Sequence, residues 1–233
     1  MTLSIIIPVY NERDTILTVV QQVQQLPVDK EIIVIDNCST DGTRELVREL
    51  EGEGRRVILQ PRNLSKGNSV KKGIQAARGE YLVIQDGDLE YNPQDLMRLL
   101  EVVRQPEVAA AFGSRILGAQ QQSQTMPRSV FSWGRQALTG LFRLLYNSRL
   151  TDIATCYKMA PTKLLQSLRL RCDGFDLDFE LAAKLTKLAK RQSLHVVEVP
   201  ISYQPRTVRQ GKKMRCWDGL AATWALLKYR FVD

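Results

Sequence analysis

The sequence predicts an α/β protein with a doubly wound, largely parallel sheet. Short β-branched runs alternate with segments whose apolar residues recur at helical spacing, which gives strand, helix, strand, helix, strand within about the first sixty residues. Several of these runs end in acidic residues, at the edge of an open sheet where ligands bind. No internal repeat or linker divides the 233 residues, so we expect one domain, 1–233.

The first half of the chain contains four predicted strands separated by helices. The strands are short runs rich in Ile and Val, at 3–9, 31–36, 57–60 and from Tyr81 onward. Asn11 can cap the first helix, which buries apolar residues between Ile16 and Leu26. The second helix extends to about Leu50. The third follows a Gly-containing turn around Lys66, where backbone N–H groups can face phosphate.

The second half continues the alternation with longer helices. Asn92 and Pro93 suit the cap and first position of a helix, and strands are expected at 108–113, 152–159 and 194–203. Amphipathic helices are predicted at 128–146, 174–191 and 218–231. The Gln-rich stretch 118–126 is interpreted as a mobile loop or lid, and 204–215 as a basic loop without an acid.

Composition narrows the function classes. A hydrophobic fraction of 44% and a charged fraction of 25% are those of a soluble globular protein. No apolar run approaches the roughly 20 residues that span a bilayer, no signal peptide opens the sequence, and four scattered cysteines suit a reducing cytoplasm. The net charge of +8 favours an anionic partner. Nucleic acid is disfavoured because the basic loop lacks aromatics for stacking, and the oligomeric state, including a homodimer, stays open.

Three acidic residues at alternate positions end the strand that begins at Tyr81. Asp86, Asp88 and Glu90 supply hard oxygen ligands of the kind that Mg²⁺ or Mn²⁺ prefers. The alternative is a solvated turn rich in Asp and Gly. We therefore expect a divalent cation and a phosphate-bearing ligand at this sheet edge, with the turn as the competing interpretation.

Several motifs in order carry a family resemblance. They are Pro8 to Glu12, Asp36 to Asp41, Asp86-Gly87-Asp88, Gly113-Ser114-Arg115, Gly174 to Glu180, Glu198 to Ile201, and Arg206 followed by Gly211-Lys212-Lys213. Together they resemble family 2 glycosyltransferases, and among these the polyprenyl-phosphate hexosyltransferases, although no C-terminal membrane helix is seen. The resemblance implies a GT-A fold, Rossmann-like, with three α/β/α layers around a central, mostly parallel mixed sheet. It also implies an inverting transferase, with 1–113 binding the nucleotide sugar and 114–233 the acceptor.

The resemblance assigns roles on the donor side. Asp36 would accept from the N–H of a base, and Asp86, Asp88 and Glu90 would hold Mg²⁺ or Mn²⁺ on the diphosphate. Relatives often carry Asp where Asn37 stands and Gln where Glu90 stands. The other donor-binding candidates lie at the neighbouring strand end, in the turn before the third helix and in the basic loop: Pro8, Tyr10, Glu12, Lys66, Arg206, Lys212 and Lys213.

On the acceptor side, the resemblance implies a carboxylate and a phosphate site. Asp152, Asp178 and Glu180 are the candidate catalytic acids, and Asp152 is favoured. The candidates for binding the acceptor phosphate are Arg115, Arg128 and Ser132. A lipid phosphate is already ionised at neutral pH and needs no strong general base, whereas a hydroxyl acceptor needs one.

Other functions remain open. A soluble glycosyltransferase acting on a glycan or small hydroxylated acceptor would use the same donor site. A sugar nucleotidyltransferase is disfavoured because Pro8 to Glu12 lacks the expected Gly-rich loop, and a non-catalytic nucleotide-sugar-binding module is the third alternative. We favour a UDP-sugar over a GDP-sugar and a polyprenyl phosphate acceptor. The expected location is the cytoplasm, with peripheral contact to the cytoplasmic face of the membrane.

Overall fold

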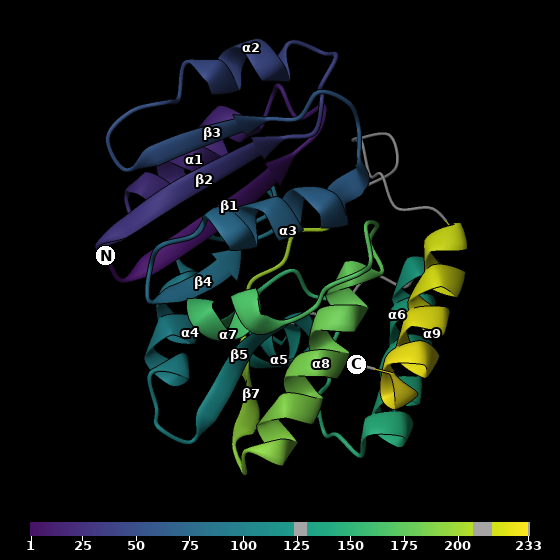
Figure 1. The fold of residues 1–233 in the computed structure, drawn as a ribbon. Coiled ribbons are helices and arrows are strands. Elements are labelled where there is room, and N and C mark those ends of the chain that lie inside the picture. Colours follow the sequence, from purple (N-terminus) through teal and green to yellow (C-terminus); the bar gives the residue numbers. More distant parts are fainter. Residues whose placement is uncertain (124–129, 207–215, 233) are drawn as a thin grey trace.

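The structure, a computed structural model, describes residues 1–123, 130–206 and 216–232. Within these ranges seven strands form one sheet in the order β3-β2-β1-β4-β6-β5-β7 (Figure 1). The strands are β1 (Leu3–Val9), β2 (Lys30–Asp36), β3 (Arg55–Leu59), β4 (Tyr81–Ile84), β5 (Val108–Ser114), β6 (Lys158–Pro161) and β7 (His195–Pro200). The helices are α1 (Ile16–Gln24), α2 (Thr43–Arg48), α3 (Ser65–Ala76), α4 (Asp95–Val103), α5 (Arg115–Gln121), α6 (Val130–Tyr146), α7 (Thr162–Ser167), α8 (Leu177–Arg191) and α9 (Cys216–Phe231).

The sheet is mixed and mostly parallel, as expected. Strand β1 pairs in parallel with β2 and β4, β2 pairs in parallel with β3, and β5 pairs in parallel with β7. Strand β6 is antiparallel to both of its neighbours, β4 and β5. Consequently the carboxyl ends of β1, β2 and β4 meet at one edge, and the loops that follow them lie together.

The apolar runs explain the layers. The Ile residues of β1 and β2 are buried on both faces of the sheet, and helices lie on both sides of it (Figure 1). Helix α3 packs on β1 and β2, while α4 packs on β5 and β6. The prediction of a three-layer α/β/α architecture is confirmed.

Three local predictions are wrong. The stretch taken as a loop from residue 118 is helical as far as Gln121, within α5, and residues 124–129 lie outside the described residues. The predicted strand 152–159 is mostly irregular, because the N–H groups of Thr151 and Asp152 donate to the side chain of Glu198 instead of to a neighbouring strand. Strand β7 ends at Pro200, and Tyr203 pairs only with Tyr91 in an isolated bridge.

Helices α6, α8 and α9 pack against one another beside the sheet. Helices α6 and α9 lie side by side (Figure 1), and the Oη of Tyr146 donates to the carbonyl of Leu226 at 2.8 Å. Helix α9 buries Ala222, Ala225 and Tyr229 on its inner side. In the described part of the chain, no helix is both long and apolar enough to cross a membrane.

Candidate active site

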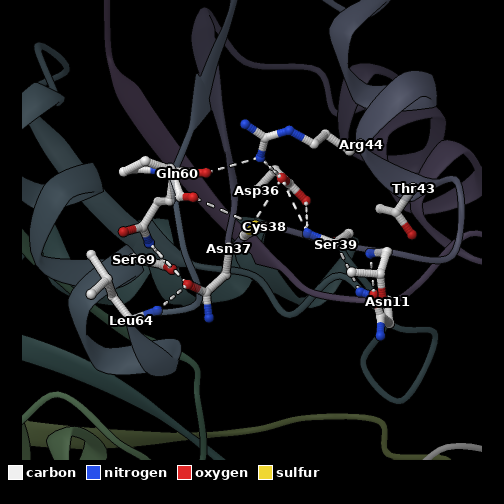
Figure 2. Close-up of polar contacts among 12 residues, drawn as sticks. Asn11, Asp36, Asn37, Cys38, Ser39, Thr43, Arg44, Gln60, Leu64 and Ser69 are labelled. Atoms are coloured by element: carbon white, nitrogen blue, oxygen red, sulfur yellow. Dashed lines mark hydrogen bonds and ion pairs between the residues drawn. The ribbon is translucent and has the colours of Figure 1, made fainter.

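The loops after β1 and β2 are tied to each other by side chains. The N–H of Asn11 donates to Ser39 Oγ at 3.0 Å, and the N–H of Thr40 donates back to Asn11 Oδ1 at 2.8 Å (Figure 2). The N–H of Glu12 donates to Thr43 Oγ1 at 2.9 Å. Asn11 and Cys38 have positive φ angles of 50° and 62°, which few non-glycine residues adopt. The two loops therefore hold one defined shape at the sheet edge.

Asp36 ends β2 and is fully buried. Its carboxylate accepts from the N–H groups of Cys38 and Ser39 and from Arg44 Nη1 at 2.5 Å (Figure 2). In this structure Asp36 therefore caps the turn that follows β2. The contact with a base N–H stays a prediction, and it requires Asp36 to become accessible to the nucleoside.

Asn37 joins the same loop to the turn before α3. Its Oδ1 accepts from the N–H of Leu64 at 2.8 Å (Figure 2). Its Nδ2 donates to Asn63 Oδ1 at 2.8 Å. An amide can accept and donate at once, whereas a carboxylate only accepts. The departure from Asp at this position thus gives the loop a bond that Asp could not make.

Asp86, beyond β4, is paired with a lysine from α3. Lys66 Nζ lies 2.7 Å from Asp86 Oδ1 and 3.7 Å from Asp178 Oδ2, and Lys158 Nζ lies 3.6 Å from Asp178 Oδ1. Burial by itself would raise the pKa of Asp86, but the charge of Lys66 outweighs it and lowers that pKa. These four side chains form the first part of the site and bring together the predicted residues Lys66, Asp86 and Asp178.

Asp88, Glu12 and Glu90 surround one guanidinium. Arg206 donates to both oxygens of Glu12 at 2.8 and 3.0 Å and to Asp88 Oδ2 at 2.6 Å. Burial and the neighbouring charge of Asp86 raise the pKa of Asp88 to about 7, even though Arg206 acts in the opposite direction. Three carboxylates, those of Glu12, Asp88 and Glu90, thus share the single positive charge of Arg206.

Glu90 does not join Asp86 and Asp88 as a third metal ligand in this structure. Its carboxylate accepts from Tyr203 Oη at 2.9 Å and from the N–H of Arg206 at 2.7 Å. The Tyr91–Tyr203 bridge brings residues 203–206 alongside Glu90. Across the described ranges no set of three or more acidic, His or Cys side chains is arranged to hold a metal ion. Asp86 and Asp88 nevertheless suit Mg²⁺ or Mn²⁺, since Mg²⁺ is commonly held by one or two carboxylates plus substrate phosphates and water.

On the acceptor side, Asp152 and Arg115 form a buried pair. Arg115 Nε and Nη2 donate to the two oxygens of Asp152 at 2.6 and 2.8 Å, and Arg115 Nη1 donates to Tyr91 Oη at 3.2 Å. Burial by itself would raise the pKa of Asp152, but Arg115 outweighs it and the pKa is lowered. Asp152 is fully buried, so the predicted role in activating an acceptor is not open to it in this arrangement. The guanidinium of Arg115, predicted to bind the acceptor phosphate, is likewise engaged, with Asp152 and Tyr91.

Arg135 lies beside this pair and is not among the residues predicted from the sequence. Its Nη1 lies 3.8 Å from Asp152 Oδ2, its side chain is 10% exposed, and it follows Ser132 by one turn of α6. Burial and the nearby charge of Arg115 lower the pKa of Arg135. Two guanidiniums therefore face one carboxylate. The i, i+3 spacing from Ser132 was the available signal. Ser132 is half-buried on α6, while Arg128 lies outside the described residues.

Glu180 has a structural role. It is fully buried in the first turn of α8 and accepts from the N–H groups of Arg171 and Cys172 at distances from 2.7 to 3.0 Å. Lys184 neutralises it at 2.8 Å. We therefore withdraw Glu180 from the candidate catalytic acids and retain Asp178.

The remaining predicted residues are placed less directly. Pro8 is buried within β1, and Tyr10 is half-buried directly after it. Lys212 and Lys213 lie outside the described residues. Lys158 is fully buried beside Asp178 and was not anticipated, because it lies in a segment that the sequence presents only as a strand.

Comparisons with known proteins agree with this arrangement. The family model described as glycosyl transferase family 2 matches residues 4–168. "Glycosyltransferase AglD" of Haloferax volcanii is 30% identical over 211 residues, covering 87% of this chain and 33% of AglD. "Low-salt glycan biosynthesis hexosyltransferase Agl6" of the same organism is 26% identical, covering 88% of this chain and 48% of Agl6. The chain thus spans about a third to a half of these two relatives.

The fold has a solved counterpart. Glucosyl-3-phosphoglycerate synthase of Mycobacterium tuberculosis, solved with uridine diphosphate, superposes with a TM-score of 0.72 at 20% identity, covering 100% of this chain and 81% of that chain. This likeness confirms the expected GT-A fold. Because the family model matches residues 4–168 and the similarity to AglD covers 87% of this chain, the chain belongs to glycosyl transferase family 2.

Proposed function

We propose that the protein is an inverting, metal-dependent hexosyltransferase that moves a sugar from a nucleotide diphosphate to a polyprenyl phosphate. The observation that carries the proposal is the pair Asp86 and Asp88 at the carboxyl end of β4. Each is held by a cation, Lys66 or Arg206, and the pKa of Asp88 is still raised to about 7. Such a pair favours additional positive charge, as a divalent cation supplies.

The donor would bind where the loops after β1, β2 and β4 meet. Asp86 and Asp88 would hold Mg²⁺ or Mn²⁺, and the bound ion would stabilise the negative charge that develops on the departing nucleoside diphosphate. Lys66 and Arg206 would bind diphosphate oxygens. A UDP-sugar is favoured over a GDP-sugar, and the Mycobacterium tuberculosis synthase is described in complex with Mn²⁺ and UDP-glucose.

The acceptor side supports an anionic acceptor. Two guanidiniums, those of Arg115 and Arg135, lie beside Asp152, and guanidiniums suit phosphate oxygens. The acids of this region are engaged: Asp152 by Arg115, and Glu198 by the N–H groups of Thr151 and Asp152. Neither acid is therefore free to act as a general base, and a phosphate acceptor, which is already ionised, needs none. The role of the two arginines would be to orient the acceptor phosphate.

A small soluble acceptor is the alternative. The Mycobacterium tuberculosis synthase is described in complex with phosphoglyceric acid, an anionic hydroxylated molecule. A hydroxyl nucleophile would need a base. Asp178, between Lys66 and Lys158, is the carboxylate retained for that role.

One assay separates these functions. The protein is incubated with Mn²⁺ and UDP- or GDP-sugars, with and without undecaprenyl phosphate, and released nucleoside diphosphate is measured. Release stimulated by the lipid supports the proposal, and release only with phosphorylated or hydroxylated small molecules supports the alternative. Formation of nucleoside triphosphate from pyrophosphate would indicate a nucleotidyltransferase, and binding without turnover a binding module. Nucleoside triphosphate formation, or binding without turnover, would contradict the proposal.

A further inference from the structure

Helix α9 exposes an apolar stripe with a regular spacing. Five large side chains follow one another at intervals of three and four residues along its outer side. They are Trp217 (76% exposed), Leu220 (62%), Trp224 (66%), Leu227 (38%) and Phe231 (82%). The inner side of the same helix is apolar as well, so this stripe is not needed for packing against α6 and α8. Exposed apolar patches of this kind mark interaction surfaces.

Neighbouring α6 exposes a second apolar stripe. Trp133 is 69% exposed and Leu144 is 80% exposed, and their spacing of three helical turns places them on one side of the helix with the exposed Ala137 and Gly140. We call the exposed residues of both stripes the α6–α9 apolar surface. All three tryptophans of the chain belong to it.

The charges around this surface are mostly positive. The stretch 130–150, which contains α6, holds Arg135, Arg143 and Arg149 and neither Asp nor Glu. Arg143 and Arg149 are exposed, and α9 ends with Lys228 and Arg230 in its last turn. A surface of Trp, Phe and Leu bordered by arginines suits the interface of an anionic bilayer, where Trp is enriched and basic residues meet lipid phosphates.

A second copy of the chain is the competing occupant, because the spacing on α9 is also that of a coiled-coil seam. Coiled-coil seams favour Leu, Ile and Val, whereas two of the five positions on α9 are Trp and one is Phe. The stripe on α6 includes Ala137 and Gly140, which offer little to a second helix seam. The aromatic content and the positive border therefore favour lipid.

We propose that the α6–α9 apolar surface docks the protein on an anionic membrane, with α6 and α9 lying in the interface plane. This deepens the proposed function, since it would bring the site to a membrane-embedded acceptor. The surface itself is inferred independently of the chemistry. Binding to vesicles without donor, metal or polyprenyl phosphate therefore tests it separately from the glycosyl transfer.

The experiment is co-sedimentation with vesicles of phosphatidylcholine, with and without phosphatidylglycerol. We expect the wild type to bind the anionic vesicles and to shift its tryptophan emission to shorter wavelength. Leu220→Gln and Trp224→Gln should each weaken this binding about tenfold, the loss expected when part of one large apolar side chain no longer leaves water. Leu17→Gln, on the exposed side of α1, is the matched control and should bind like the wild type.

Two results would overturn the inference. One is wild-type vesicle binding by both Leu220→Gln and Trp224→Gln. The other is a wild type that ignores anionic vesicles and forms a dimer by light scattering, which Leu220→Gln dissociates. Circular dichroism of each variant verifies its fold, and none of the substituted side chains is buried.

Discussion

The donor and acceptor sides of the site both pair carboxylates with cations, but in different proportions. On the donor side, Glu12, Asp88 and Glu90 surround the single guanidinium of Arg206. On the acceptor side, Arg115 and Arg135 face the single carboxylate of Asp152. The first cluster has an excess of negative charge. In the second, Asp152 and the adjacent Glu198, which accepts from the N–H of Asp152 at 2.8 Å, balance the two arginines.

The pKa directions follow from this difference. The pKa of Asp88 is raised to about 7, whereas the pKa of the more deeply buried Asp152 is lowered. The Arg115–Asp152 pair is therefore satisfied and structural, while the donor-side cluster is short of positive charge and suited to a cation. Pairing in a structure thus does not distinguish a support from a binding site, but the balance of charge does.

The largest effect is expected from removing the acceptor-side arginine. Arg115→Ala leaves Asp152 buried without its partner, and breaking such a buried pair costs about 3–5 kcal/mol. Arg206→Ala should lower the free energy of unfolding by less, because Glu12 and Asp88 keep 10% and 13% of their side-chain surface exposed, whereas Asp152 keeps none. Urea denaturation measures both. Equal losses would remove the distinction between the two sides.

The next effect concerns turnover. Asp88→Asn should lower kcat about 10²–10³-fold, the size of loss seen when charge stabilisation in the transition state is removed. Its free energy of unfolding should not fall, because a carboxylate repelled by Asp86 is removed. Glu90→Gln is the matched control, since its amide oxygen can still accept from the N–H of Arg206 while its Nε2 donates to Tyr203 Oη. A Glu90→Gln variant as impaired as Asp88→Asn would restore Glu90 to the metal site.

A smaller effect separates the two acids of α8. Glu180→Gln should cost about 1–3 kcal/mol of folding free energy, because the neutral amide loses charge-assisted bonds with Lys184 and the N–H groups of Arg171 and Cys172. Its kcat should equal that of the wild type at a temperature where both are folded. Asp178→Asn should lower kcat for a hydroxyl acceptor, which needs a base, and should also lower the free energy of unfolding, because the buried Lys158 loses its carboxylate partner. A low kcat for folded Glu180→Gln would return this residue to the catalytic acids.

Counted per pH unit, the smallest expected change in stability is a pH dependence. Because the folded pKa of Asp88 is raised from 3.8 to about 7, the folded state binds this proton more tightly than the unfolded state. Without added metal, this group should therefore make stability fall as pH rises from about 4 to about 7, by at most about 1.4 kcal/mol per pH unit. Asp152 has the opposite sign, since its stabilisation is present above 3.8 and is lost at lower pH.

Urea titrations between about pH 5 and about pH 7 measure this dependence. Asp88→Asn should flatten the slope, and the Leu17→Gln variant should leave it unchanged. An unaltered slope in Asp88→Asn would place the titration on another group and weaken the charge imbalance inferred for the donor side.

Much of the fold follows from the sequence alone. Strands β1 and β4 begin where their β-branched runs predict, and the acids of Asp86-Gly87-Asp88 lie at the ligand edge of the sheet. These features depend on residues close together in the chain, so periodicity and turn chemistry are enough to predict them. The same local signals failed at 152–157, where the backbone bonds the distant Glu198 instead of a strand.

The tertiary structure decided which charged groups serve the site. Arg206 reaches Glu12 across 194 positions of sequence, and Arg115 reaches Asp152 across 37. No local pattern distinguishes Asp152 and Glu180, which are buried and engaged, from Asp178, which meets Lys66 and Lys158. The sequence by itself determined the sheet and the position of its acidic edge. Which carboxylates are neutralised there, and which lack positive charge, depends on partners that only folding brings together.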